Sequence, residues 1–359
     1  MIKSWAMRKF HHSFRRFCAL LIGLVFLVSG ALKLMDPVGT GLKMVEYFKF
    51  LHLDFLIPAG KGLGLAFALL EALVGAALVS GIARKAAAVV VLALIVFFTG
   101  LTLVLYLVNP EMDCGCFGEA FRLTHFQSLL KNVILLALAL IAFIPLGDGY
   151  ESRKPKRWGF AVVSLAIVVF SVYSWRNLPM MDFTAFSLGS QILSGAGSSE
   201  EEAQEQDWAV LSLSDAFGEY CDDLASVGEV LVVSVYEPAR IDSLGWERIS
   251  ATVRDAFICG VRPLLLTPDA EGVPMTLGEC LYFADYKTLL TLNRSNGGAT
   301  YLADGLIVEK WPARDLPAGE EIAGLLSSEP LEAAASATNR GRFTFQGSLL
   351  VCAALLILL

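Results

Sequence analysis

Charged residues are scarce in this chain of 359 residues: they make up 18% of it, whereas hydrophobic residues make up 55%. A soluble domain averages roughly 25% charged and about 45–50% apolar residues. The shortage of charge therefore excludes an ordinary soluble protein and predicts a membrane protein that contacts the lipid bilayer. The formal net charge is −7, and no basic patch predicts binding of nucleic acid.

The chain also lacks the cysteine and histidine patterns of common zinc sites. Only one pair among its seven cysteines is close in sequence, namely Cys114 and Cys116. Two sulfur ligands do not complete a tetrahedral zinc site, and no second Cys/His pair lies at zinc spacing, so we expect no metal. Cys18 and Cys352 fall inside apolar runs and are predicted to be small buried side chains.

Five apolar runs predict membrane-spanning helices, each of which needs about 20 residues. They cover residues 17–35, 62–80, 86–108, 126–146 and 160–175. We interpret the first as a retained helix rather than a signal peptide, because it continues past the small residues 29–31. Within the connection 36–61, Met44–Phe50 is predicted as an interfacial helix, with a plain loop as the alternative. Residues 345–359 predict either a terminal transmembrane helix or a packed tail.

Basic residues indicate how these helices are oriented. They gather at the N-terminus, at Arg84 and Lys85, and within 153–157, which are alternate connections. Under the positive-inside rule these segments are cytoplasmic, so the connection 109–125 and the chain after the fifth span lie on the outer side. We therefore expect a multi-pass protein of a bacterial inner membrane, with a periplasmic C-terminal domain. Disulfides persist in that compartment.

The loop Met112–Glu119 carries Cys114 and Cys116 on either side of one glycine. A disulfide between them would close a very small ring, and strained disulfides are the labile or catalytic ones. His125 and the start of the following helix favour thiolate formation, whereas two carboxylates in the loop oppose it. The pair is thus interpreted as a redox-active dithiol; a structural disulfide or two unreactive thiols are the alternatives.

Glu71 lies near the middle of the second span, where a carboxylate is costly. Such residues usually face a bundle interior or a wet cavity. One interpretation makes Glu71 a proton carrier or a carboxylate of a quinone site. The other makes it a hydrogen-bonding group in helix packing, or a partner for Lys33. The position of an acid in a span does not by itself separate the two.

The C-terminal part of the chain predicts a soluble α/β domain over residues 208–330, between a linker at 178–207 and a second linker at 331–344. Strand and helix patterns alternate through it, and an Asp-Gly turn at 304–305 predicts a terminal hairpin. The predicted elements are strands in 227–235 and 261–267, helices at 242–257 and 285–293, and hairpin strands at 299–302 and 306–311. This order is that of a thioredoxin-like core.

Two stretches of the helical part resemble known membrane families. Gly23–Pro37 is similar to the first helix of DoxX-like proteins, and Met112–Glu119 resembles the Cys-Gly-Cys-Phe-Gly loop of the related MauE branch. The resemblance covers roughly residues 15–146 and implies a four-helix bundle in the inner membrane. MauE is implicated in maturation of methylamine dehydrogenase, a disulfide-rich periplasmic enzyme. DoxX is associated with a quinone-linked sulfur oxidoreductase, so the cofactor that the resemblance implies is a quinone.

The C-terminal domain departs from the thioredoxin family that it resembles. A working thioredoxin carries Cys-x-x-Cys after a core strand, where this chain has Tyr236–Asp242 without cysteine. The proline expected in cis before the hairpin is also missing from Ser295–Gly298. The resemblance therefore implies a degenerate domain that binds or docks. A structural disulfide between Cys259 and Cys280 is one further expectation.

These observations lead to two functional hypotheses. In the first, Cys114 and Cys116 cycle between dithiol and disulfide, exchange electrons with a quinone or a periplasmic client protein, and use Glu71 as a proton carrier. In the second, the protein is a non-catalytic scaffold whose outer domain recruits a partner. Whether the chain is an enzyme, a membrane thiol–disulfide oxidoreductase, is the point on which they differ.

Overall fold

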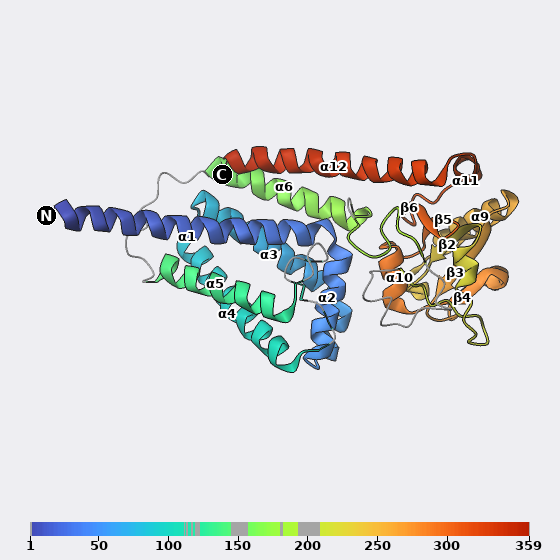
Figure 1. Ribbon diagram of the computed structural model, residues 1–359, viewed down its shortest axis with the longest axis horizontal. Helices are drawn as coiled ribbons and strands as arrows, with labels where there is room; N and C mark the ends of the chain where they lie inside the picture. Colours follow the sequence, from blue (N-terminus) through green and yellow to red (C-terminus); the bar gives the residue numbers. More distant parts are fainter. Residues whose placement is uncertain are drawn as a thin grey trace. The chain divides into compact units, whose positions relative to one another are not determined.

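The computed structural model describes residues 2–358 except 111, 113, 116–117, 119–122, 145–156, 180–181 and 193–208. The chain forms two compact units. One consists of residues 1–176 with 348–359, and the other of residues 177–347. The first is helical and the second is built around a sheet (Figure 1).

The helical unit contains the predicted membrane spans. Its helices are α1 (Ile2–Met35), α2 (Pro37–Phe50), η1 (Asp54–Ala59), α3 (Gly60–Ser80), α4 (Arg84–Val108), α5 (His125–Phe143) and α6 (Arg157–Arg176). Among the described residues, five segments are long and apolar enough to cross a membrane: Ser13–Met35, Asp54–Ser80, Arg84–Val108, His125–Phe143 and Arg157–Arg176. The prediction of a multi-pass membrane protein with five helices is confirmed.

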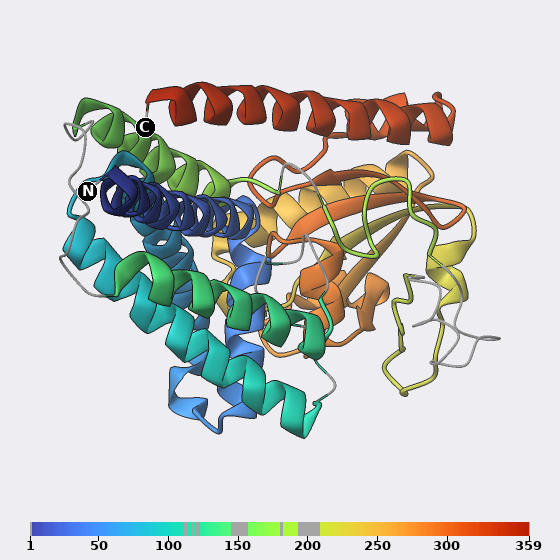
Figure 2. The same cartoon turned by 60° about the vertical axis from the view of Figure 1, so that its left-hand side comes forward.

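Helices α1 and α3 approach each other at glycines. A Cβ atom on Gly30 would lie 2.5 Å from the backbone nitrogen of Ala72, and one on Gly75 would lie 2.5 Å from that of Leu27. Small residues allow such close packing between membrane helices, where van der Waals contact replaces the hydrophobic effect as the main driving force. Helices α4 and α5 also run side by side, as both views show (Figures 1 and 2).

A sharp corner joins α1 to α2. Asp36 caps α2 by accepting a hydrogen bond from the backbone nitrogen of Gly39 at 2.8 Å, and Pro37 occupies the first turn, where no backbone donor is needed. The Thr40 hydroxyl donates to the carbonyl of Lys33 at 3.0 Å, which closes the corner. The connection is therefore helical over Pro37–Phe50, longer than the predicted helix at Met44–Phe50.

The second unit contains a mixed five-stranded sheet in the order β4-β3-β2-β5-β6. The strands are β2 (Glu229–Ser234), β3 (Arg262–Thr267), β4 (Leu281–Phe283), β5 (Gly298–Ala303) and β6 (Leu306–Trp311). β2 pairs in parallel with β3 and antiparallel with β5, and β5 pairs antiparallel with β6. The described helices of this unit are α8 (Asp223–Ser226), η2 (Pro238–Arg240), α9 (Ser243–Ile258), η3 (Met275–Cys280), α10 (Tyr286–Leu292), α11 (Gly319–Leu326) and most of α12 (Pro330–Leu358).

Buried apolar side chains of β2 and β3 form the centre of this unit, as the near-continuous apolar runs in their sequences predict. Leu231, Val233 and Leu265 are each 0% exposed, and the helix α9 packs Ile249 and Ala256 onto them. The strands, helices and hairpin that the sequence predicts are all present, whereas the three-residue strand β4 was not predicted. The predicted α/β domain is thus confirmed as a mixed sheet with helices.

Both predicted linkers differ from the structure. Residues 331–344 belong to α12, because their alanines favour helix even where the surface is polar. Within 178–207, the described residues up to 192 pack onto the sheet: Phe186 is buried, and Ile192 donates from its backbone to the carbonyl of Gly305 at 2.8 Å. The remainder, 193–207, lies outside the described residues. Whether 345–359 spans a membrane stays a prediction.

Candidate functional site: a cavity beside Cys114

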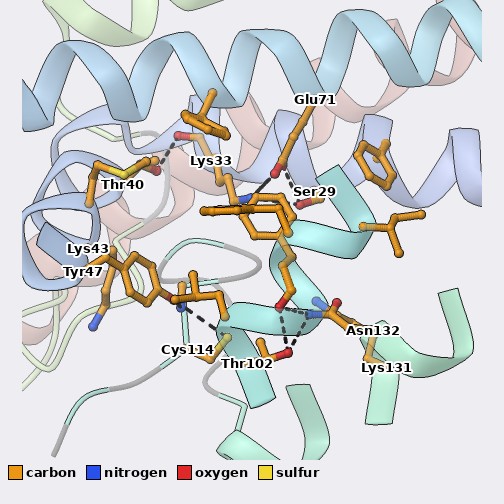
Figure 3. Close-up of a pocket in the computed structure, with 18 of the residues that line it drawn as sticks. Ser29, Lys33, Thr40, Lys43, Tyr47, Glu71, Thr102, Cys114, Lys131 and Asn132 are labelled. Atoms are coloured by element: carbon orange, nitrogen blue, oxygen red, sulfur yellow. Dashed lines mark hydrogen bonds and ion pairs between the residues drawn. The ribbon is translucent and has the colours of Figure 1, made fainter. Parts of the chain in front are cut away.

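The helical unit contains a partly open cavity of about 170 Å³. Its wall is mostly apolar and rich in aromatic rings, with a few polar groups that point inward (Figure 3). The polar lining residues are Ser29, Lys33, Thr40, Lys43, Tyr47, Glu71, Thr102, Cys114, Lys131 and Asn132. Five helices, α1 to α5, and the cysteine loop contribute them, so the cavity exists only when the bundle is folded.

Lys33 and Glu71 form an ion pair in this wall. The Lys33 Nζ atom lies 2.6 Å from Glu71 Oε2 and 2.8 Å from Oε1, and the two residues are 8% and 3% exposed. The Ser29 hydroxyl donates to Glu71 Oε2 at 3.0 Å. Ser29 and Lys33 are one helical turn apart on α1, so both reach the same point of α3 (Figure 3).

The apolar surroundings make this pair energetically demanding. Removing two charges from water costs several kcal/mol per ion, which mutual attraction repays only with good geometry and further hydrogen bonds. The Lys33 ammonium group also lies 5.8 Å from the centre of the Phe98 ring, close enough for a cation–π contact. Of the two interpretations of Glu71, the structure shows the partnership with Lys33; it also brings this pair to the cavity that Cys114 lines.

Tyr47 of α2 holds the described part of the cysteine loop. Its hydroxyl accepts from the backbone nitrogen of Gly115 at 2.9 Å and donates to Cys114 Sγ at 3.9 Å. A Cβ atom on residue 115 would lie 3.1 Å from Lys43 Cβ, so glycine lets the loop approach α2 this closely. Cys114 is 2% exposed and forms an isolated antiparallel bridge with Leu123.

Thr102 and Asn132 add a neutral polar group on another side of the cavity. Asn132 Nδ2 donates to Thr102 Oγ1 and to the carbonyl of Phe98, each at 3.2 Å. Both residues are nearly fully buried, at 2% and 5% exposure. This amide links α4 to α5, and its carbonyl is a hydrogen-bond acceptor within an otherwise apolar wall.

The structure shows the position of only some of the site residues that the sequence predicts. Glu71 and Cys114 come together at one cavity, whereas Cys116 lies outside the described residues. The sequence did not indicate Ser29, Tyr47, Thr102 or Asn132 as site residues. The spacing of Ser29 and Lys33 on one helix was a usable signal, but nothing local pairs Tyr47 with a cysteine 67 positions away.

The thiols of the α/β unit have other surroundings. Cys221, Cys259 and Cys280 are all free, so the expected disulfide between Cys259 and Cys280 is wrong. Cys259 Sγ donates to the Gly319 carbonyl at 3.5 Å, and Cys280 Sγ to that of Leu277 at 3.2 Å. Burial raises the pKa of Cys280; burial and the nearby carboxylates Asp215 and Asp222 raise that of Cys221.

The segment that forms the cavity also matches a known protein family in sequence. Residues 11–145 match the family described as Methylamine utilisation protein MauE. The matched segment includes every residue that lines the cavity, but it covers less than half of the chain. This MauE-like segment is therefore similar to the family over α1 to α5, and the match does not extend to the α/β unit. No curated protein and no solved structure matches the chain.

Proposed function

We propose that the protein carries out thiol–disulfide redox chemistry at the membrane through Cys114 and Cys116. The observation that carries this proposal is the position of Cys114 Sγ, in the wall of a cavity that also holds a buried ion pair. Oxidation of the two thiols forms one S–S bond and releases two electrons and two protons. A periplasmic client dithiol supplies two electrons and two protons when it reduces that bond and becomes a disulfide itself.

Tyr47 prepares Cys114 for this chemistry. A hydrogen bond donated to sulfur stabilises a thiolate more than a thiol, and the thiolate is the species that attacks a disulfide. The Gly115 backbone donates to the same phenol oxygen, which orients the Tyr47 hydrogen toward the sulfur. Tyr47 is therefore a positioning residue for the nucleophile.

The size and the aromatic wall of the cavity support the proposal that it binds the ring of a quinone, the cofactor that the family resemblance implies. A dry cavity of about 150 Å³ holds one benzene ring, and this one has about 170 Å³ with aromatic walls. The Lys33 ammonium group would donate a hydrogen bond to a ring oxygen, and the Asn132 carbonyl would accept one from a hydroxyl of the reduced ring. A bound quinone supplies an acceptor for two electrons and two protons. Glu71 would hold or release a proton at its carboxylate, with Lys33 beside it to balance the charge.

The α/β unit would dock the client. The crossover through α9 and the order β3-β2-β5-β6, with β2 inside, support a degenerate thioredoxin-like core. At the place of the redox motif, the Asn296 amide instead joins two loops: its Oδ1 accepts from the Glu237 nitrogen at 3.0 Å and its Nδ2 donates to the Glu237 carbonyl at 2.8 Å. We place this unit and the cysteine loop in the periplasm of a bacterium that uses methylamine, from the charge pattern and the family match.

The test compares Tyr47→Phe with Tyr106→Phe, a tyrosine of α4 that is 45% exposed. Thiols in native membranes are trapped by alkylation at several times, with and without depletion of quinone, and Cys114 is followed by mass spectrometry. We expect the Cys114/Cys116 redox state to follow quinone supply, and Tyr47→Phe to slow Cys114 alkylation several-fold. Tyr106→Phe should leave the rate unchanged.

One result would favour the scaffold hypothesis instead. If the redox state of Cys114 does not change with quinone, and Cys114→Ser leaves the thiols of partner proteins unaltered, the redox proposal fails. The protein would then hold a partner at the membrane without chemistry of its own.

A further inference from the structure

We propose that a file of bound water molecules runs along one face of α5, from His125 to the cavity, and carries protons. Three polar side chains mark this face at positions i, i+3 and i+7: His125, Ser128 and Asn132. Such spacing places side chains on one side of a helix. At a rise of about 1.5 Å per residue, the face extends roughly 10 Å along the helix axis.

His125 presents a proton acceptor at the start of α5. Its Nε2 atom lies 3.1 Å from the Pro110 carbonyl, which only accepts, so Nε2 carries the hydrogen. In neutral imidazole the other nitrogen, Nδ1, is then an acceptor. This atom is buried and has no hydrogen-bond partner in the described protein. It is therefore available to a water molecule.

Ser128 is the second step. It is 0% exposed, and its Oγ atom has no partner among the described residues. A buried hydroxyl without a partner destabilises the folded chain. A water molecule that bonds to two or more such groups removes that cost, and buried water in proteins occupies such places. One turn on lies Asn132, whose amide lines the cavity (Figure 3).

The chain offers a contrast in α6. Ser164 Oγ is also buried and without a described partner, but the residues three and four positions away are apolar: Phe160, Ala161, Ile167 and Val168. Along α6 a water molecule there would find no polar side chain at these positions, whereas along α5 a water molecule at Ser128 would find His125 on one side and Asn132 on the other. Both serines thus have a buried hydroxyl without a described partner, but only at Ser128 do we expect a water molecule to supply the hydrogen bond.

The water file goes beyond the redox proposal, but its use as a proton supply rests on it. Oxidation of the dithiol releases two protons and reduction of a quinone takes up two, so the two steps balance when they are coupled. Glu71 can hold one proton, and a route to the end of α5 would let the other leave or enter when the two steps are separated in time. A route through His125 and Ser128 connects the cavity to the end of α5. Hydrogen-bonded waters carry protons along it, and no covalent step at either side chain is needed.

The experiment measures water directly, so its outcome is separate from that of the redox test. Ser128→Cys and Ser164→Cys are made in the full chain and kept in native membranes. Each is treated with methanethiosulfonate ethylammonium, a small charged reagent that reacts in water, and the labelled peptide is quantified by mass spectrometry. We expect Ser128→Cys to react at least ten times faster than Ser164→Cys. Equal rates would overturn the proposal.

Alanine variants keep the proposal testable if a cysteine disturbs folding. Ser128→Ala should lower the melting temperature of the purified full chain, because it removes a hydroxyl that water has satisfied. Ser164→Ala should leave the melting temperature unchanged or raise it, because it removes an unsatisfied group. A rise in both variants would mean that the α5 face is dry and would overturn the water file, whatever the redox state of Cys114.

Discussion

At the residue scale, the main constraint on the helical unit is charge buried among apolar side chains. Lys33 and Glu71 satisfy each other, with Ser29 as a third member. Neither charge is tolerable there alone, because the wall offers little else to stabilise it. The stability of the helical unit therefore depends on both residues, and the proposed proton transfer would depend on the same pair.

The stability contribution can be separated with a double-mutant cycle. Lys33→Met and Glu71→Leu should each lower the free energy of unfolding by about 3–5 kcal/mol, since each leaves one buried charge without its partner. The double variant should be far less destabilised than the sum. Unfolding in mixed micelles measures all three. Additive effects would show that the two side chains do not act as a pair.

At the element scale, close contact between α1 and α3 positions that pair. Gly30 and Gly75 bring the two backbones together, and without this approach Lys33 would not reach Glu71 across the interface. The tightness of the contact is set by backbone atoms, which cannot rotate away from an added methyl group. On this side, the position of the cavity wall therefore depends on Gly30 and Gly75, which have no side chains.

Gly30→Ala should therefore lower the free energy of unfolding by about 1–3 kcal/mol, the usual effect of overpacking. Gly100→Ala is the matched control, because an added Cβ on this glycine of α4 has nothing within 4 Å. It should be neutral or slightly stabilising, as alanine favours helix. Thermal unfolding of the full chain in detergent distinguishes the two, and a similar loss in both would contradict the close contact.

At the scale of the whole molecule, the chain forms two units, and an ion pair between Asp182 and Lys310 fixes the start of the second unit. Burial would raise the pKa of Asp182, but Lys310, at 2.7 Å, and a hydrogen bond from Thr184 outweigh burial and lower it. The carboxylate thus stabilises the fold above its unfolded pKa, about 3.9, and this contribution is lost as pH falls through the lower folded value. The segment that follows Asp182 packs onto the sheet beside it.

Asp182→Asn should speed amide hydrogen exchange across residues 182–192 at neutral pH, because it removes a charged partner worth about 1.5–3 kcal/mol. The difference from the native chain should shrink in strong acid, where Asp182 is protonated in both states. Asp315→Asn provides the control, since that carboxylate pairs at the surface with Arg314. An effect of Asp182→Asn that does not depend on pH would exclude the charge as its cause.

The sequence by itself determined most elements of both units. Long apolar runs predict membrane helices because backbone groups inside a bilayer must bond within the segment. Alternation and apolar runs predict β2, β3 and α9, and Asp304 with Gly305 predicts the hairpin, because these signals act within a few residues. Composition wrongly predicted linkers in two places. At 331–344 the helical propensity of the residues prevailed over their polarity, and at 182–192 the packing onto the sheet depends on residues that are distant in sequence.

Only the tertiary structure decided the site. Glu71 was visible as an unusual acid and Cys114 as an unusual thiol, but their common cavity required α1, α3 and the cysteine loop to meet. Tyr47 gave no signal, since a tyrosine in an aromatic stretch is ordinary until its hydroxyl reaches a sulfur 67 positions away. The physical reason is the distance along the chain over which the interactions act. Membrane spans and strands depend on residues that are neighbours in sequence, whereas the cavity depends on the packing of distant helices, which Gly30 and Gly75 allow to approach closely.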